Sequence, residues 1–238
     1  MAEEAKAAAK PYISPSQLNT FENCGEAYRR RYIEGERIPP GVAALRGTGV
    51  HRGAEANFIQ KIESRVDLPK NEIVDRAVAE FDGRMAIEGL FLDPEAEARG
   101  KAIVIGEERD TTARLAGLFS DEVAPVYQPT AVEEKIRIEL PESPRDLLGI
   151  IDLTASLAID ESGAEGIIDY KTGKKTKSQG EFDSSSQITL YDLAYRAKRG
   201  KAPSFLRVEQ LVDLKSGPKR VQNQTTRSTP DFKAAISR

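Results

Sequence analysis

Hydrophobic residues in the first half of the chain recur at the spacing of an α-helix. Ser14–Pro15 is typical of a helix start, and apolar side chains continue at helical intervals to about residue 33. The same spacing predicts a helix from the GTGVH stretch at residue 47 to about residue 62, and another over about 70–88. Asp93–Pro94 predicts the start of a further helix that continues to about residue 123. The N-terminal half is therefore predicted to be helical.

After Pro129 the pattern changes to the alternation of β-strands. Residues 131–140 alternate between apolar and polar side chains. Two longer apolar runs, 147–159 and 166–171, are separated by the polar turn DESGAE and predict an antiparallel hairpin. Two further strands, in FLRVEQLVDL and KRVQNQ, predict a second hairpin that closes the sheet.

A polar, lysine-rich loop over residues 172–183 leads to a predicted helix from about 185 to 199, between the two hairpins. The order is thus helices, three strands, one helix and two strands. This order predicts an α/β fold in which helices flank a central mixed β-sheet, with a helical N-terminal half.

Length and composition suit one globular domain. The chain has 238 residues, of which 39% are hydrophobic and 31% charged, so it has enough apolar content for a core. We expect a flexible lead over residues 1–11, a single domain over 12–226 and a tail over 227–238. Because Pro230 is typical of the first position of a helix, this tail is either a simple end or the start of a further C-terminal helix.

The chain shows no sequence feature of export. Its first residues lack the apolar stretch of a secretory signal, and no window approaches the roughly 18 apolar residues of a membrane span. Cys24 is the only cysteine, so internal disulfides are excluded. We therefore expect an intracellular, cytoplasmic protein without a membrane partner.

The supply of metal-binding side chains restricts the chemistry. His51 is the only histidine, so zinc sites built from several histidines are excluded. A bound metal must be held mainly by oxygen, which favours Mg²⁺ or Mn²⁺. The net charge of -3 argues against a protein that coats nucleic acid with a basic surface, although it permits a local basic groove.

The stretch GIIDYKTGK, residues 166–174, ends an apolar strand with an acid and a lysine. Asp169 and Lys171 are two residues apart, so their side chains lie on the same face of a strand. Asp152 lies on the preceding strand, and a hairpin can bring it to the same end of the sheet. A same-face ion pair is the simplest interpretation of Asp-x-Lys. Two carboxylates beside a lysine also form the minimal site for metal-dependent phosphodiester hydrolysis.

Four stretches, in order, resemble motifs of a known family. GIIDLTASLAIDESGAEGIIDYKTGK is similar to the G-x-x-D … D-x-K core of the PD-(D/E)XK nuclease superfamily, in its RecB-like exonuclease branch. SPSQLNTFENCGEAYRRRY resembles the opening helix of that branch, RGTGVH its Gly-x-x-x-His motif and QITLY its Gln-x-x-x-Tyr motif. The resemblance covers about residues 12–215 and implies a restriction-endonuclease-like fold.

The resemblance also implies roles for individual residues. Asp152 and Asp169 would be the metal-binding carboxylates of the catalytic core, with His51 as an additional metal ligand. Lys171 would be the catalytic lysine. The remaining catalytic positions lie one helical turn apart and would position the DNA backbone or the lysine: Gln187 and Tyr191.

A further acid on the strand before the core often faces the site in this family. The family pattern points to Glu133, whereas strand alternation places Glu134 with the apolar face that includes Ile136. Both interpretations stay open, and we prefer Glu133 as the additional metal ligand.

Basic side chains outside the core are candidates for DNA contacts. Arg30 and Arg31 lie on the polar face of the opening helix, and Lys174 and Lys175 lie in the loop after the core. Either pair could contact phosphates or form a solvated face. The tyrosines near the N-terminus are expected at the core or its boundary rather than as base-stacking platforms: Tyr12, Tyr28 and Tyr32.

Cys24 lies where some members of the branch place the first of four cysteines that ligate a [4Fe–4S] cluster. Such a cluster needs four thiolates, and this chain has one. We therefore expect no iron–sulfur cluster in this chain and predict that Cys24 is a small buried apolar residue.

Together these features predict a Mg²⁺- or Mn²⁺-dependent exonuclease that hydrolyses phosphodiester bonds of DNA in recombination, repair or replication. A helicase or recombination protein is the candidate protein partner. A CRISPR-associated, spacer-processing exonuclease would share every motif. A catalytically silent module that binds DNA or a helicase is the other alternative, and the intact Asp … Asp-x-Lys set argues against it.

Overall fold

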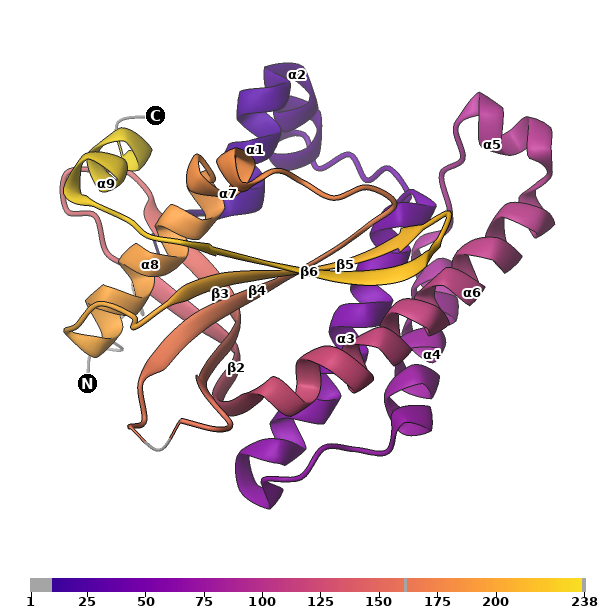
Figure 1. The fold of residues 1–238 in the computed structure, drawn as a ribbon. Coiled ribbons are helices and arrows are strands. Elements are labelled where there is room, and N and C mark those ends of the chain that lie inside the picture. The colour runs from indigo at the N-terminus through magenta and orange to yellow at the C-terminus, as the bar shows by residue number, and fades with distance from the viewer. Residues whose placement is uncertain (1–9, 161, 237–238) are drawn as a thin grey trace, which may run out of the picture.

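A six-stranded mixed sheet lies between two layers of helices in the part of the chain that the computed structural model describes, residues 10–160 and 162–236 (Figure 1). The predicted fold class is confirmed. Most of the predicted flexible lead, residues 1–9, and the last two residues of the predicted tail lie outside the described residues. None of the helices in the described ranges is long and apolar enough to cross a membrane.

The sheet is built around two antiparallel hairpins joined by one parallel pairing. Its strands are β1 (Tyr12–Ile13), β2 (Tyr127–Ile138), β3 (Asp146–Leu157), β4 (Glu165–Gly173), β5 (Leu206–Leu214) and β6 (Gly217–Thr225). The order is β1-β3-β4-β5-β6, and β2 pairs with β3. The hairpins β3–β4 and β5–β6 are antiparallel, as predicted, whereas β4 runs parallel to β5 and β1 runs parallel to β3.

One face of the sheet is covered by the helical N-terminal half. Helices α3 (Val42–Ser64) and α6 (Lys101–Leu118) pack on this face, and α4 (Lys70–Glu88) packs against both of them (Figure 1). Phe58 of α3, Phe119 after α6 and Tyr170 of β4 form a buried aromatic cluster with ring centroids 5.4–6.3 Å apart. This core fixes α3 against β4.

The opposite face is covered by α8 (Ser186–Arg199), which follows the short helix α7 (Gln179–Asp183). Ile188 and Tyr195 of α8 pack with Ile151 and Ile167 of the sheet in a second core. The C-terminal helix α9 (Thr229–Ile236) packs against α8, and the guanidinium of Arg196 lies 5.2 Å from the ring centroid of Phe232. The apolar alternation predicted for the strands thus serves two cores, one on each face.

The opening helix differs from its prediction. Instead of one continuous helix there are α1 (Pro15–Asn23), α2 (Gly25–Tyr28) and the π-turn η1 (Arg29–Ile33). The break is at Cys24, whose extended backbone ends α1 and whose sulfur accepts a hydrogen bond from Ala27 N at 3.4 Å. Cys24 is exposed, so the prediction that it is buried is wrong. None of these three elements has a buried residue, so no core holds them in one helix.

The helix predicted to start at Asp93–Pro94 is also divided. It consists of α5 (Pro94–Arg99), α6 and the turns η2 (Phe119–Val123) and η3 (Ala124–Val126). The division falls at Gly100, whose φ of 95° is a conformation that glycine adopts far more readily than other residues. Helix α3 starts at Val42, before the GTGVH stretch where the sequence pattern placed it.

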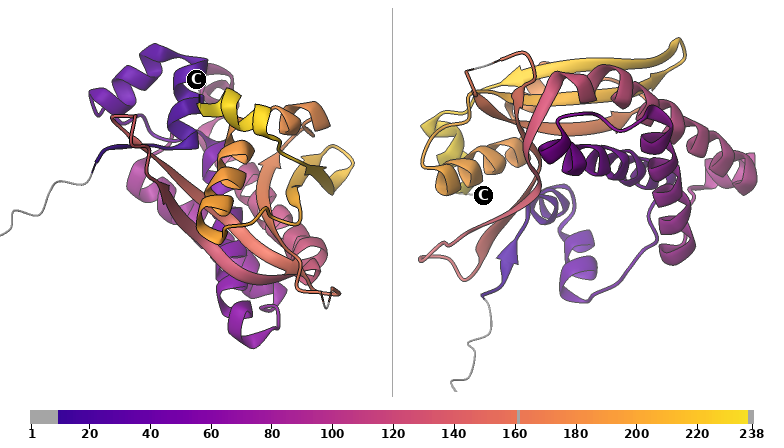
Figure 2. Two further views of the ribbon diagram at one scale, coloured as in Figure 1. Left: turned by 90° about the vertical axis from the view of Figure 1, so that its left-hand side faces the viewer. Right: turned by 90° about the horizontal axis from the view of Figure 1, so that it is seen from below.

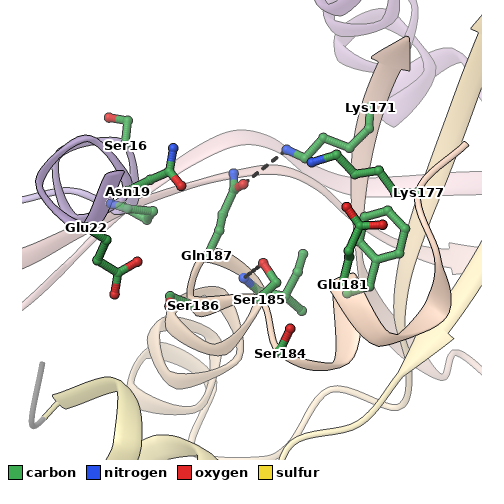
Figure 3. A pocket seen from close by; sticks show the side chains of 13 residues that line it. Ser16, Asn19, Glu22, Lys171, Lys177, Glu181, Ser184, Ser185, Ser186 and Gln187 are labelled. Carbon is green, nitrogen blue, oxygen red and sulfur yellow. Dashed lines mark hydrogen bonds between the residues drawn. The ribbon is translucent and has the colours of Figure 1, made fainter. Parts of the chain in front are cut away.

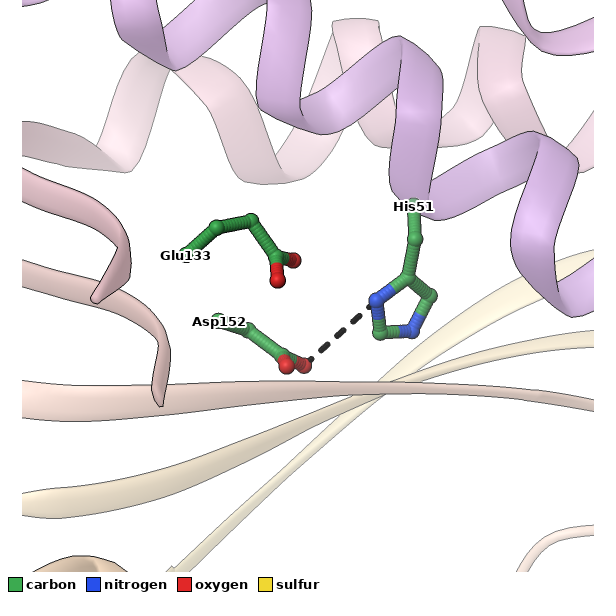
Figure 4. A group of neighbouring side chains, drawn as sticks. All are labelled: His51, Glu133 and Asp152. Carbon is green, nitrogen blue, oxygen red and sulfur yellow. Dashed lines mark ion pairs between the residues drawn. The ribbon is translucent and has the colours of Figure 1, made fainter. Parts of the chain in front are cut away.

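Two glycines let α3 approach α4 closely. A Cβ atom added at Gly49 would lie 2.6 Å from the Ala77 carbonyl oxygen, and one added at Gly53 would lie 2.8 Å from the Ile73 carbonyl oxygen. Side chains at these positions would therefore push the two helices apart. His51 lies between these glycines in sequence and extends from α3 toward the sheet (Figure 4).

We predict that Gly49→Ala lowers the free energy of unfolding by about 1–3 kcal/mol, because the added methyl group overpacks the α3–α4 contact. Gly83→Ala in α4 is the matched control. A Cβ there meets nothing within 4 Å, so the change should stabilise the helix by about 0.5–1 kcal/mol. Urea unfolding monitored by circular dichroism measures both; equal effects of the two substitutions would contradict the packing explanation.

Candidate active site

The site lies at a fork where β3 and β4 separate. Their antiparallel pairing runs from Ser156↔Glu165 to Leu153↔Ile168 and stops there. The next residues in this register are Asp152 and Asp169, so two carboxylates lie at the opening of the fork. The backbone N–H of Tyr170 donates to Asp152 Oδ2 at 3.1 Å, which spans the fork.

Three side chains from three elements meet on the α3 side of this fork. His51 of α3, Glu133 of β2 and Asp152 of β3 each place one ligand atom within 4.8 Å of the others (Figure 4). His51 Nδ1 lies 3.6 Å from Asp152 Oδ2. We call these three residues the His51 group. The sequence-based ligand set thus includes these three, while Asp169 lies outside the group.

The orientation of the His51 ring leaves one nitrogen available to a cation. His51 Nε2 lies 3.0 Å from the backbone carbonyl oxygen of Tyr170. Because a carbonyl oxygen only accepts hydrogen bonds, Nε2 carries a proton and Nδ1 faces the carboxylates. A ring held by a backbone carbonyl in this way is typical of metal-binding histidines.

The backbone at Glu133 explains why strand alternation alone could not choose between the two acids of β2. Glu133 has a φ of 48°, and the side-chain alternation changes phase there. Val132 packs in the core on the α3 face, whereas Ile136 packs in the core on the α8 face. Glu133 therefore joins the His51 group. Glu134 forms ion pairs with Lys198 at 2.8 Å and Arg199 at 3.2 Å.

A second set of side chains lies on the α8 side of the fork. Lys171 Nζ donates to Asp169 Oδ1 at 2.9 Å and to Gln187 Oε1 at 3.1 Å. Gln187 Nε2 in turn donates to the Tyr191 hydroxyl at 2.6 Å. Four of the five residues in the predicted catalytic set are thus linked by hydrogen bonds, and Asp152 is the fifth. The link forms because α8 carries Gln187 and Tyr191 on the face that packs against the sheet.

Burial of several acids at one place changes their proton affinities. Burial raises the pKa of Glu133 to about 7, and the nearby charge of Asp152 adds to the effect. Burial also raises the pKa of Asp169, where the charge of Lys171 opposes the shift and that of Asp152 adds to it. For Lys171, burial acts to lower the pKa, but the carboxylates of Asp169 and Asp152 outweigh it and raise the value. The ammonium therefore stays charged at neutral pH.

The residues present fit a divalent cation. Asp169 Oδ2 is buried and has no hydrogen-bond partner among the residues that the structure describes. It lies at the same fork as the carboxylates of Glu133 and Asp152 and the free Nδ1 of His51. Oxygen ligands with a single imidazole suit Mg²⁺ or Mn²⁺. A cation here would stabilise the ionised form of these carboxylates, which burial alone disfavours.

The candidate DNA-binding residues lie outside the fork and most have partners of their own. Arg30 pairs with Glu26 at 2.8 Å, and the guanidinium of Arg31 lies 5.6 Å from the Tyr32 ring centroid. Lys174 pairs with the buried carboxylate of Glu108 at 2.5 Å. Lys175 is exposed.

The sequence did not predict the cavity that lies beside Lys171. A cavity of about 490 Å³ opens beside Lys171 and Gln187, and Lys177, Ser16 and Asn19 also line it (Figure 3). These residues come from α1 and from the loop after β4, which are far apart in the chain. The lysine-rich composition of the loop was the available signal, but the spacing of residues gave no reason to prefer Lys177.

The raised pKa of Glu133 predicts a pH dependence of stability when divalent ions are removed. The folded protein binds this proton more tightly than the unfolded chain, so the free energy of unfolding should fall as pH rises from about 4.5 to about 7. Glu133→Gln should remove this fall in the free energy of unfolding and stabilise the metal-free protein at pH 8 by about 1–3 kcal/mol. Glu134→Gln breaks ion pairs instead, so it should not stabilise the protein at pH 8. Thermal unfolding in EDTA across this range tests the difference; parallel profiles for wild type and Glu133→Gln would contradict it.

Comparison with known proteins identifies the family. A model described as the PD-(D/E)XK nuclease superfamily matches residues 12–237, which include the fork and both layers of helices. No curated protein sequence matches the chain. A crystal structure of SSO0001 aligns with 77% of this chain and 83% of that one at 11% identity, with a TM-score of 0.33. The chain belongs to the PD-(D/E)XK nuclease superfamily, and its mixed sheet flanked by helices is a restriction-endonuclease-like fold.

Proposed function

We propose that this protein is a Mg²⁺- or Mn²⁺-dependent exonuclease that hydrolyses the phosphodiester bonds of DNA. The observation that carries the proposal is the fork between β3 and β4. There the ion pair of Lys171 with Asp169 adjoins the His51 group at one strand end. Family membership supports hydrolysis of nucleic acid, and this arrangement supports an intact catalytic site.

The proposed metal ligands are His51, Glu133, Asp152 and Asp169. A divalent ion held by them would polarise a phosphate oxygen and lower the pKa of a water molecule. The ligands come from α3, β2, β3 and β4, so the fold rather than local sequence brings them together. Their positions are supported on both faces, by the α3 core and by α8.

Lys171 supplies the positive charge for the phosphate in this proposal. The Lys171 side chain is 32% exposed and lines the polar cavity, whereas the side chain of its partner Asp169 is fully buried. The lysine can therefore meet a substrate without losing its carboxylate partner. Charge that develops on the scissile phosphate would be stabilised by this ammonium. Gln187 and Tyr191 act as positioning residues, because their hydrogen bonds hold the ammonium in place.

The finer assignment rests on the order of sequence motifs. The opening helix, the Gly-x-x-x-His motif, the core and the Gln-x-x-x-Tyr motif follow one another as in the RecB-like exonuclease branch. We therefore assign the protein to that branch, with a role in DNA recombination, repair or replication inside the cell. A helicase or recombination protein is the partner that this role would require.

We predict that Lys171→Ala lowers the rate of DNA cleavage on the order of 10²–10³-fold, since one preorganised stabiliser of transition-state charge is lost. Binding of DNA in Ca²⁺ should persist, because one phosphate contact supplies only part of the electrostatic affinity. Lys215→Ala, at an exposed lysine in the turn between β5 and β6, is the control and should cleave at nearly the wild-type rate.

End-labelled linear DNA and a closed circle of the same sequence are the substrates for this measurement. Loss of the linear DNA from its ends with the circle left intact supports an exonuclease. Cleavage of the circle at the same rate would contradict exonuclease action. A wild-type protein that binds DNA without cutting either substrate would instead identify a silent DNA-binding module.

We predict that Glu133→Gln and Asp152→Asn each weaken Mn²⁺ binding at least tenfold, because a neutral amide replaces an anionic oxygen ligand. Glu134→Gln should leave the affinity unchanged, since Glu134 is bound to Lys198 and Arg199. Calorimetric titration with Mn²⁺ measures all three variants. Equal losses of Mn²⁺ affinity in Glu133→Gln and Glu134→Gln would show that Glu133 is not a specific metal ligand.

A further inference from the structure

One edge of β3 is left open between β1 and β4. On this edge β1 pairs with Asp146 and Leu147, and β4 pairs with residues 153–156. The opposite edge pairs with β2 along nearly its whole length. Residues 148–152 thus form a gap in the sheet that ends at Asp152, beside the proposed catalytic fork.

A cavity of about 360 Å³ lies over this gap. Three tyrosine rings line it, together with the aliphatic side chains of Leu148 and Ile150. The rings are those of Tyr12 from β1, Tyr32 from η1 and Tyr191 from α8. Pro15 and four polar residues complete the lining: Ser14, Ser16, Gln17 and Gln187. The exposed surface of the cavity is therefore mainly apolar and aromatic, and it is open to solvent. Such a lining suits the flat faces of nucleobases, which stack on aromatic side chains regardless of sequence.

This aromatic cavity joins the polar cavity that contains Lys171. Pro15, Ser16 and Gln187 line both, so the two cavities meet at Gln187. The tyrosines line the aromatic cavity, whereas Lys171 and Lys177 line the polar one beside Gln187 (Figure 3). In a single nucleic acid strand, the bases project from one side of a continuous sugar–phosphate backbone. The two linings therefore match the two parts of one nucleotide chain.

Much of the lining of the aromatic cavity comes from a segment near the N-terminus that contributes little to either core. We call residues 12–33, from β1 through η1, the N-terminal arm. It lies at the periphery of the molecule (Figure 2), where α1 contacts α8, and its three helical elements bury no residue. Tyr12, which the sequence pattern placed at the core or its boundary, is 43% exposed. An exposed ring over an apolar cavity gains burial when a ligand enters.

We propose that Tyr12 and Tyr32 stack an unpaired base of the DNA strand next to the phosphate held at Lys171, and that they thereby favour single-stranded ends. The inference rests on the proposed function for the identity of the substrate. The cavity lies at the small end of the roughly 300–1,000 Å³ range of ligand pockets, which suits one nucleotide rather than a base pair. A base within a duplex is already stacked on both sides and would have to leave its partner to enter.

The test is equilibrium binding in Ca²⁺, which keeps cleavage out of the measurement. The probes are short single strands with 2-aminopurine at successive positions from either end, and blunt duplexes of the same sequence. We expect quenching of 2-aminopurine fluorescence at one position near one end. Tyr32→Ala and Tyr12→Ala should abolish it and weaken single-strand binding on the order of 5- to 100-fold, while duplex binding stays unchanged. Tyr32→Phe should keep most of the affinity, because it keeps the ring.

Phe21→Ala is the matched control. Phe21 is an aromatic residue of the same arm that is 56% exposed and lies outside the cavity lining, so its removal should change neither quenching nor affinity. Unchanged quenching in both tyrosine-to-alanine variants, or equal losses for single strands and duplexes, would overturn the inference while cleavage by the wild type still supports the proposed function. Tyrosine-dependent quenching in a protein that does not cut DNA would support base stacking and overturn the proposed nuclease function. Absence of any DNA binding would overturn both.

Discussion

The concentration of negative charge at the fork between β3 and β4 is the constraint on which the rest of the site depends. Glu133, Asp152 and Asp169 converge there, and Asp169 is fully buried. Carboxylates that are close together and removed from water cannot all ionise without compensation. Lys171 compensates one of them from the α8 side. A cation on the α3 side, where Nδ1 of His51 faces Glu133 and Asp152, would compensate the others. Without an ion, repulsion between the carboxylates is only partly compensated, so the site is suited to a bound cation.

The two faces of the sheet make different contributions to this arrangement. On the α3 face, glycines at positions 49 and 53 let α3 approach α4, and the buried aromatic cluster fixes α3 against β4. His51 can then bond to the Tyr170 carbonyl oxygen across that contact. On the α8 face, the buried stripe that packs against the sheet also carries Gln187 and Tyr191 to Lys171. The residues of the candidate site are thus held by the same contacts that form the two cores, so the site needs no separate supporting structure.

The parts of the fold that followed from sequence are those in which local pattern decides the outcome. The hairpin that brings Asp152 and Asp169 together was predictable, because two apolar runs joined by a short polar turn pair with each other. The opening helix was not, because its pattern of apolar residues suggested a buried face that the structure does not provide. The choice between Glu133 and Glu134 also lay beyond periodicity. It depends on one residue with positive φ, which shifts the alternation of β2 at that point.

The aromatic cavity could not be predicted from sequence, because tertiary structure rather than local pattern brings its lining together. Tyr12, Tyr32 and Tyr191 are separated by many residues, and no spacing rule connects them. They meet because β1 joins the sheet by only two residues and leaves the middle of β3 open. A longer β1 would cover residues 148–152 with backbone hydrogen bonds and fill the space over Leu148 and Ile150. The shortness of one edge strand therefore keeps a path open beside the charged fork, so that the sheet both holds the acids and leaves room for a substrate to reach them.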